Sequence, residues 1–336
     1  MPLGKIRAVL VLTVLTALFV FPLNLFPLNQ GGAAEEPAPG PFVSEGSTRV
    51  YLSSGRGAFA WWSGEALLAV ENRDFAPVIR VIDREGREIS RIPLEIPNAR
   101  GIRVLNNALA RGPDGMIAVI GHADFNDYLG SNFLALLSPD GQRETVVRLS
   151  PFNPDAVTVA ADGTIWLAGH EFTPAGKWNK NSDLIRRYDR AGKLVGSFVN
   201  WSNLNPPVNF PSPDSLSVLV SSPDRVGWYS KFGRTYIEFS LEGNVMYRVN
   251  TPAHERSEML QPALCEDGRL FVSAAVNNNP SRKIKARWGI YVLDRERGEW
   301  NYIPREGRYG RAYGCDRTRL ATTTEHGFIT WLRPAK

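Results

Sequence analysis

The chain has 336 residues, of which 43% are hydrophobic and 22% charged, so its composition is that of a globular protein with ample material for a core. Its 39 basic and 34 acidic residues leave a net charge of only +5, which gives no support for a nucleic-acid partner or a strongly anionic one. Its two cysteines exclude a disulfide-rich scaffold, and they form no C-x-x-C pair that would indicate a thiol metal or redox site.

The N-terminal segment, residues 1–34, has the pattern of a secretory signal. Lys5 and Arg7 precede an apolar run over residues 8–26, and a stretch of small residues ends at Ala34, where cleavage is expected. We therefore expect an exported protein, periplasmic or extracellular.

The same apolar run is long enough to span a bilayer, so an uncleaved membrane anchor is the alternative. Pro22 and Pro27 shorten the uninterrupted helix and favour cleavage. Contact with a membrane is expected only if this segment is retained. Residues 35–46 are rich in proline and predict a flexible linker.

From residue 47 onwards, a degenerate repeat of about 50 residues carries two hairpins, each with strands of period two around a tight turn. The turns of one hairpin series lie at Gly86, Gly141, Gly192, Gly243 and Gly298. The turns of the second, interleaved series lie at Gly64, Gly115, Gly163, Arg225, Gly268 and Thr318.

Two hairpins per repeat are typical of a propeller blade, so residues 47–336 predict an all-β, six-bladed β-propeller. The last repeat lacks a fourth strand. We expect residues 47–54 to supply it by pairing with residues 327–334, which closes the ring and removes its exposed sheet edges. Trp166 and Trp228 recur in the second strand of successive blades, where packing between blades is expected. We expect the protein to be a monomer.

The segments DGTIWLAGH (162–170) and DGRLFVSAA (267–275) resemble those of NHL-type and gluconolactonase-like six-bladed propellers. The resemblance covers residues 47–336 and concerns architecture. The fold it implies is shared by lactonases, amidating lyases, exported binding proteins and interaction scaffolds, so function has to be argued from the loops.

In each blade we label the strands A to D from the channel outwards. The predicted A–B and C–D turns are short, whereas the B–C and D–A connections on the opposite face are long, and long loops on a rigid scaffold tend to carry function. All four histidines lie on this loop face. Metal binding or general-base chemistry is one interpretation, and hydrogen bonding to a neighbouring blade is the favoured alternative.

Tryptophans near asparagine and lysine on the same face could stack a sugar or a peptide. The candidate ligand-binding residues are His122, His170, Trp178, Trp201, His254, Trp288, Arg311, Glu325 and His326.

A possible cation site involves Asn107, Asp155 and Asp214, which recur near the start of strand A in three blades. Their oxygens could hold a divalent cation such as Ca²⁺ or Zn²⁺, as the resemblance to lactonases implies. The first inner strand lacks the carboxylate that such enzymes carry, and prolines before Asp155 and Asp214 favour turn capping instead.

No catalytic motif is present, so no catalytic residue can be named and binding is favoured over catalysis. We expect an exported scaffold that binds a small molecule, glycan, peptide or protein on its loop face. A metal-dependent hydrolase or lyase of the lactonase type is the alternative.

The two cysteines, Cys265 and Cys315, each lie three residues before the A–B turn site of the last two blades. An oxidising compartment permits a disulfide between them, provided that their Cα atoms are close enough. Two buried thiols are the alternative that the sequence favours.

Overall fold

A computed structural model describes most of the chain after residue 41. The described ranges are residues 42–49, 59–63, 66–73, 76–83, 85–126, 128–204, 217–230, 235–251, 257–276, 287–305, 309–315, 319–324 and 328–334. None of these ranges contains a helix long and apolar enough to cross a membrane. The predicted signal or anchor, residues 1–34, lies outside them.

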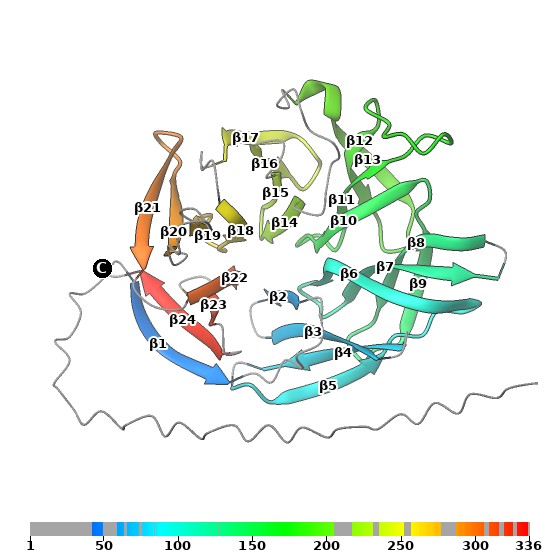
Figure 1. The fold of residues 1–336 in the computed structure, drawn as a ribbon, viewed down its shortest axis with the longest axis horizontal. Coiled ribbons are helices and arrows are strands. Elements are labelled where there is room, and N and C mark those ends of the chain that lie inside the picture. Colours follow the sequence, from blue (N-terminus) through cyan, green and yellow to red (C-terminus); the bar gives the residue numbers. More distant parts are fainter. Residues whose placement is uncertain are drawn as a thin grey trace, which may run out of the picture. The chain divides into compact units, whose positions relative to one another are not determined.

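Six four-stranded antiparallel sheets stand around a ring, which confirms the predicted six-bladed propeller (Figure 1). The innermost strands β2, β6, β10, β14, β18 and β22 contact one another in that cyclic order.

Blade one contains β2 (Phe59–Ser63), β3 (Ala66–Arg73), β4 (Ala76–Ile82) and β5 (Glu88–Pro93). Blade two contains β6 (Ala99–Arg111), β7 (Ile117–Phe125), β8 (Tyr128–Leu137) and β9 (Arg143–Arg148). Blade three contains β10 (Phe152–Val159), β11 (Ile165–Glu171), β12 (Asp183–Tyr188) and β13 (Leu194–Asn200), followed by the short helix η1 (Trp201–Asn203).

Blade four contains β14 (Ser217–Ser222), β15 (Arg225–Ser230), β16 (Thr235–Ser240) and β17 (Val245–Asn250). Blade five contains β18 (Ser257–Leu264), β19 (Leu270–Val276), β20 (Arg287–Asp294) and β21 (Glu299–Arg305). Blade six contains β22 (Tyr309–Cys315), β23 (Leu320–Thr324) and β24 (Phe328–Pro334).

The fourth strand of blade six comes from the other end of the domain. β1 (Phe42–Arg49) pairs antiparallel with β24, with Phe42 opposite Pro334 and Arg49 opposite Phe328. The pairing partner expected from the sequence was residues 47–54. The strand instead begins at Phe42, so it includes residues that were expected to belong to the linker.

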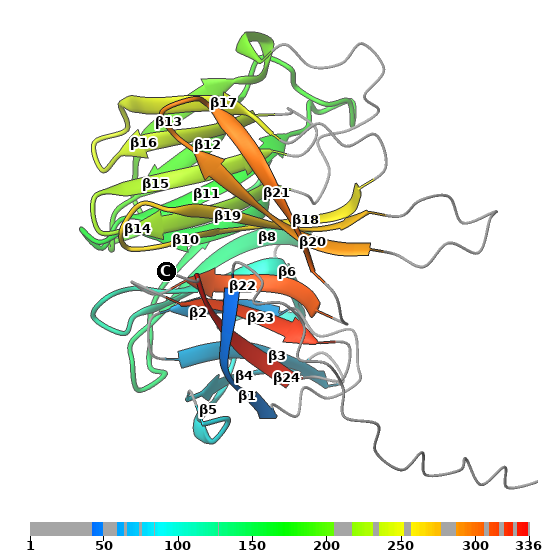
Figure 2. The same ribbon diagram turned by 90° about the vertical axis from the view of Figure 1, so that its left-hand side faces the viewer.

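The strands run between the two faces of the ring (Figure 2). Side chains from neighbouring blades pack together to form the core, as where Trp166 of blade three and Trp228 of blade four belong to one cluster. Trp166 and Trp228 are fully buried, as expected for their recurring position. Trp166 stacks on Phe198, with ring centroids 5.3 Å apart. The C–D turn of the next blade then packs on Phe198, because Gly243, at φ +100°, leaves no Cβ to collide with that ring.

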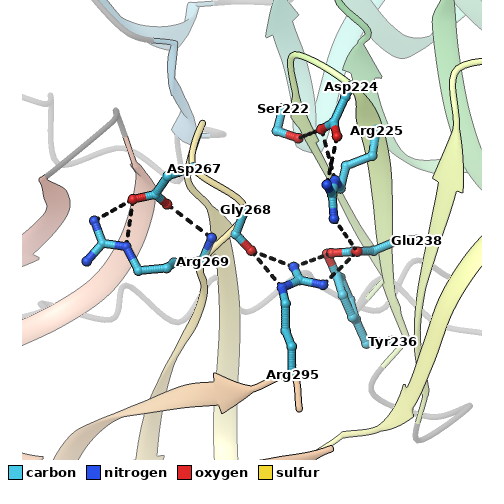
Figure 3. Close-up of polar contacts among 9 residues, drawn as sticks. All are labelled: Ser222, Asp224, Arg225, Tyr236, Glu238, Asp267, Gly268, Arg269 and Arg295. Carbon is cyan, nitrogen blue, oxygen red and sulfur yellow. Dashed lines mark hydrogen bonds and ion pairs between the residues drawn. The ribbon is translucent and has the colours of Figure 1, made fainter.

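A buried ion cluster connects blades four and five (Figure 3). Glu238, on β16, is 0% exposed and accepts hydrogen bonds from both terminal nitrogens of Arg295, at 2.7 and 2.6 Å. Arg225 and the Tyr236 hydroxyl donate to the same carboxylate, at 3.2 and 2.7 Å. Arg295 also donates to the carbonyl oxygen of Gly268, so one side chain holds a turn of blade five against a strand of blade four.

The two cysteines form a disulfide, so the expectation of two buried thiols is wrong. Inner strands of neighbouring blades converge on the channel, and this brings equivalent positions of blades five and six together. The Cα atoms of Cys265 and Cys315 lie 4.7 Å apart, within the range that a disulfide spans.

Candidate functional site

The loop-face ends of strands A and B in blade three hold a buried histidine–aspartate pair. His170, on β11, is 4% exposed, and its Nδ1 lies 3.2 Å from Oδ2 of Asp155, on β10. Asp155 sits in a β-bulge, because the pairing register shifts between Pro154 and Ala156. Proline cannot donate to a sheet ladder and is tolerated at such bulges, so the sequence Pro-Asp fixes where the strand bends.

The glycine before each predicted strand-B histidine has a steric role. A Cβ on Gly169 would collide with the backbone of Asn153 and Pro154 on the facing strand. A Cβ on Gly121 would likewise collide with the backbone oxygen of Arg103. The repeated Gly-His sequence therefore combines a close approach of strands A and B with a side chain directed at the neighbouring polar groups.

A chain of hydrogen bonds connects His170 to the equivalent histidine of blade two. Asn153 Nδ2 donates to His170 Nε2 at 3.1 Å, and Asn132 Nδ2 donates to Asn153 Oδ1 at 2.9 Å. His122 Nδ1 then donates to Asn132 Oδ1 at 3.3 Å. Each group donates to the next, from His122 through to the carboxylate of Asp155.

This direction determines which nitrogen of each imidazole carries the proton. Since Nε2 of His170 accepts from Asn153, Nδ1 is the protonated nitrogen and donates to Asp155. Asn132 Nδ2 also lies 3.4 Å from the carbonyl oxygen of Phe152, which keeps its amide nitrogen toward blade three. The half-buried His122 therefore presents Nε2 as an acceptor.

His122 Nε2 lies beside Gly130, where a Cβ would approach it to 3.3 Å. Gly130 has a φ of +71°, and its N–H donates to Asp124 Oδ1 at 2.9 Å. The left-handed backbone and the missing side chain keep Gly130 from covering this nitrogen.

Burying the carboxylate of Asp155 lowers the stability of the folded state. Burial raises the pKa of its carboxyl group, and the hydrogen bond from His170 offsets only part of that effect. A carboxyl group whose pKa is raised in the folded state stabilises the fold at low pH, and this contribution is lost as the pH rises through the folded-state pKa. Perturbed carboxyl groups of this kind are concentrated at functional sites.

Asp155→Asn is expected to raise the free energy of unfolding at about pH 7 by roughly 0.5–2 kcal/mol, the usual range of stabilising substitutions. The amide oxygen still accepts from His170, while the buried charge is removed. Urea unfolding at several pH values checks this, and the variant should lack the stability decrease that the wild type shows as the pH rises from the ordinary carboxyl pKa through the raised folded-state pKa. A variant less stable than the wild type at neutral pH would contradict the role given to burial.

The aromatic candidates divide between core and surface. Trp201, in η1, is buried and meets the half-buried Trp178 edge-on, with ring centroids 4.3 Å apart. Phe172, which sequence reasoning did not select, is 42% exposed and meets the ring of His170 edge-on, with centroids 5.0 Å apart.

Several sequence candidates have no described side chain. His254, Glu325, His326 and Asp214 lie outside the described residues. For Asn107 on β6, Trp288 on β20 and Arg311 on β22, the structure describes the strand but not the side chain.

The predicted metal site has one described side chain, Asp155, and its carboxylate is already hydrogen-bonded to His170. Within the part of the chain that the structure describes, no group of three or more His, Cys, Asp or Glu side chains is arranged to hold a metal ion. The side chains of the other two candidates, Asn107 and Asp214, lie outside the described residues, so a Ca²⁺ or Zn²⁺ site formed by the three stays a prediction.

Solved structures with a similar fold share little sequence with this chain, at 12% identity for the three that follow. A member of the DUF4221 family from Bacteroides vulgatus has a TM-score of 0.50 and 12% identity, over 87% of this chain and 97% of that chain. The WD40 domain of Pan2 from Neurospora crassa has a TM-score of 0.46 and 12% identity, over 88% of this chain and 96% of that chain.

The β-propeller domain of the Trilobed protease from Pyrococcus furiosus has a TM-score of 0.44 and 12% identity, over 70% of each chain. No family model and no curated protein matches the sequence. This likeness concerns the fold alone, and the grouping with NHL-type or gluconolactonase-like propellers stays a prediction.

Proposed function

We propose that the protein is an exported binding protein, and that its ligand site lies on the loop face at blades two and three. The observation that carries this proposal is the directed chain of hydrogen bonds from His122 to Asp155. A series of hydrogen bonds that ends in a carboxylate polarises its members in one direction. A ligand group that donates a hydrogen bond to His122 would therefore extend the series favourably.

The chemistry of that end selects the class of ligand. His122 Nε2 accepts a hydrogen bond, so the matching group is a hydroxyl or an amide N–H, as in a glycan or a peptide. The exposed ring of Phe172 contacts His170, which belongs to the same series of hydrogen bonds. Aromatic rings stack on the faces of sugars and peptide groups, so Phe172 fits the same classes of ligand.

Export is part of the proposal. It is supported by the signal-type pattern of residues 1–34 and by the disulfide between Cys265 and Cys315, since disulfides persist mainly in oxidising compartments. A metal-dependent hydrolase is less well supported, because Asp155 and His170 are hydrogen-bonded to each other.

The test compares the wild type with His122→Phe, which keeps the ring volume and removes the acceptor. Chito-oligosaccharides and tripeptides serve as probes in calorimetric titrations, with the exposed loop residue Asn126→Ala as the matched control. We expect one probe class to bind the wild type and the control equally, and to bind His122→Phe about tenfold more weakly, as the loss of one hydrogen bond implies. Equal binding to all three proteins, or no binding at about 1 mM probe, would contradict the proposal.

A further inference from the structure

Two charged side chains stand beside His122 on the same face of blade two. Asp124 lies two residues after His122 on β7, where the buried Ala123 and Phe125 alternate with these two half-buried residues, so His122 and Asp124 share one face of the sheet. Arg100, near the start of β6, is the antiparallel partner of Asp124, and its side chain therefore stands on that face as well. All three residues lie toward the loop-face ends of their strands.

Two glycines leave the carboxylate of Asp124 uncovered. The N–H of Gly130 donates to Oδ1 at 2.9 Å, and a Cβ on Gly101 would lie 3.3 Å from Oδ2. Both glycines have a left-handed backbone, at φ +71° and +63°, which L side chains rarely adopt. Since Nε2 of His122 also borders Gly130, the imidazole and the carboxylate flank one residue that has no side chain to fill the space between them.

The three polar side chains keep unused hydrogen-bonding capacity among the described residues. Nε2 of His122 accepts no hydrogen bond there, and neither does Oδ2 of Asp124. The exposed side chain of Arg100 forms no ion pair with any described residue, although Asp124 stands opposite it on the neighbouring strand. Two acceptors and one charged donor are therefore free to bind a ligand.

This combination distinguishes between classes of ligand. A hydroxyl group both donates and accepts, so two neighbouring hydroxyl groups can donate to His122 and Asp124 while they accept from Arg100. A peptide N–H donates but accepts nothing. An ammonium group is repelled by Arg100, and an anionic group is repelled by Asp124. A neutral ligand rich in hydroxyl groups uses all three side chains.

We propose that the loop-face site binds a neutral glycan, through neighbouring hydroxyl groups that donate to Nε2 of His122 and to the carboxylate of Asp124 and accept from Arg100. This inference rests on the site proposed above and names its class of ligand. Hydrogen bonds to a charged acceptor are about twice as strong as those between neutral groups. Asp124 should therefore contribute more to binding than His122.

The experiment is a calorimetric titration with the neutral trisaccharides cellotriose, maltotriose and acetylated chitotriose, in parallel with the neutral peptide N-acetyl-trialanine amide. We expect at least one trisaccharide to bind, and the peptide not to bind at about 1 mM. Asp124→Asn should weaken trisaccharide binding at least about tenfold, because the charged acceptor is lost while Oδ1 still accepts from Gly130. Arg100→Gln should also weaken it, by a smaller factor.

The exposed residues Asp140 and Arg143, at the C–D turn of the same blade, provide matched controls. Asp140→Asn and Arg143→Gln should bind the trisaccharide as the wild type does, and thermal unfolding shows that each variant is folded.

The outcomes separate this inference from the site on which it rests. Binding of the peptide alone, weakened by His122→Phe, would overturn the glycan assignment and leave the loop-face site standing. A trisaccharide that binds His122→Phe weakly but binds Asp124→Asn as tightly as the wild type would overturn the role of Asp124. Absence of binding by every probe would contradict both the inference and the loop-face site.

Discussion

Replacing Glu238 with glutamine is expected to lower the free energy of unfolding by about 3–5 kcal/mol, because Arg295 loses the carboxylate that it binds and Arg225 keeps only its neighbour Asp224 as a described anionic partner. Arg295 and Arg225 would then face a neutral amide, and one of its two polar atoms is itself a donor. The ionic contact that Glu238 makes between blades four and five is lost with it (Figure 3). Urea unfolding should therefore show a lower midpoint.

The pH dependence of this effect has a defined sign. Burial alone would raise the pKa of Glu238, but hydrogen bonds from Arg295 and Tyr236 and the positive charge of Arg295 outweigh it, so the pKa is lowered from its ordinary value of 4.5. The stabilisation is therefore present above about pH 4.5 and is lost as the pH falls through the folded-state value. The difference between wild type and Glu238→Gln should shrink in acid.

Glu242→Gln, an exposed substitution in the C–D turn of the same blade, is the matched control, with an expected change within about 0.5 kcal/mol. A loss below about 1 kcal/mol for Glu238→Gln at neutral pH would show that the cluster contributes little to the fold.

The double variant Cys265→Ser/Cys315→Ser is expected to lose about 4 kcal/mol of unfolding free energy. The disulfide closes a loop of 50 residues, and that loop length sets the chain entropy it removes from the unfolded state. Denaturant titrations with and without a reducing agent measure the effect.

The reducing agent distinguishes the loss of the disulfide from a packing defect caused by the two serine substitutions. It should destabilise the wild type by about the same amount and leave the double variant unchanged. A wild type equally stable under both conditions, with the disulfide shown to be reduced, would contradict the stabilising role of the bridge.

The sequence predicted the features that repeat. Turn glycines at a regular spacing indicated six blades, and the recurring Trp166 and Trp228 were correctly placed in the core. The closing strand was expected a few residues late, since the alternation over residues 42–54 is weak and the pairing depends on the distant strand β24.

Features that depend on contacts between blades were harder to predict. Asn132 and Asn153 connect the two histidines, yet each lies in a strand where a single asparagine has no local signature. The Asn-Pro-Asp sequence at residues 153–155 was the available signal, because its proline marks the bulge that directs Asp155 at His170. The disulfide likewise forms because the inner strands of neighbouring blades converge. The spacing of the two cysteines along the sequence does not reveal how close this convergence brings them.

The most direct test of the loop-face site is nitrogen NMR of histidine side chains in ¹⁵N-labelled protein, with His122→Phe used to assign the signals. In the neutral imidazoles of His122 and His170 we expect the proton on Nδ1, with Nε2 bare. Addition of a bound glycan or peptide should shift Nε2 of His122 first. A proton on Nε2 of His122 would contradict the proposed site, because its accessible end would then be a donor and the chain would run in the opposite direction.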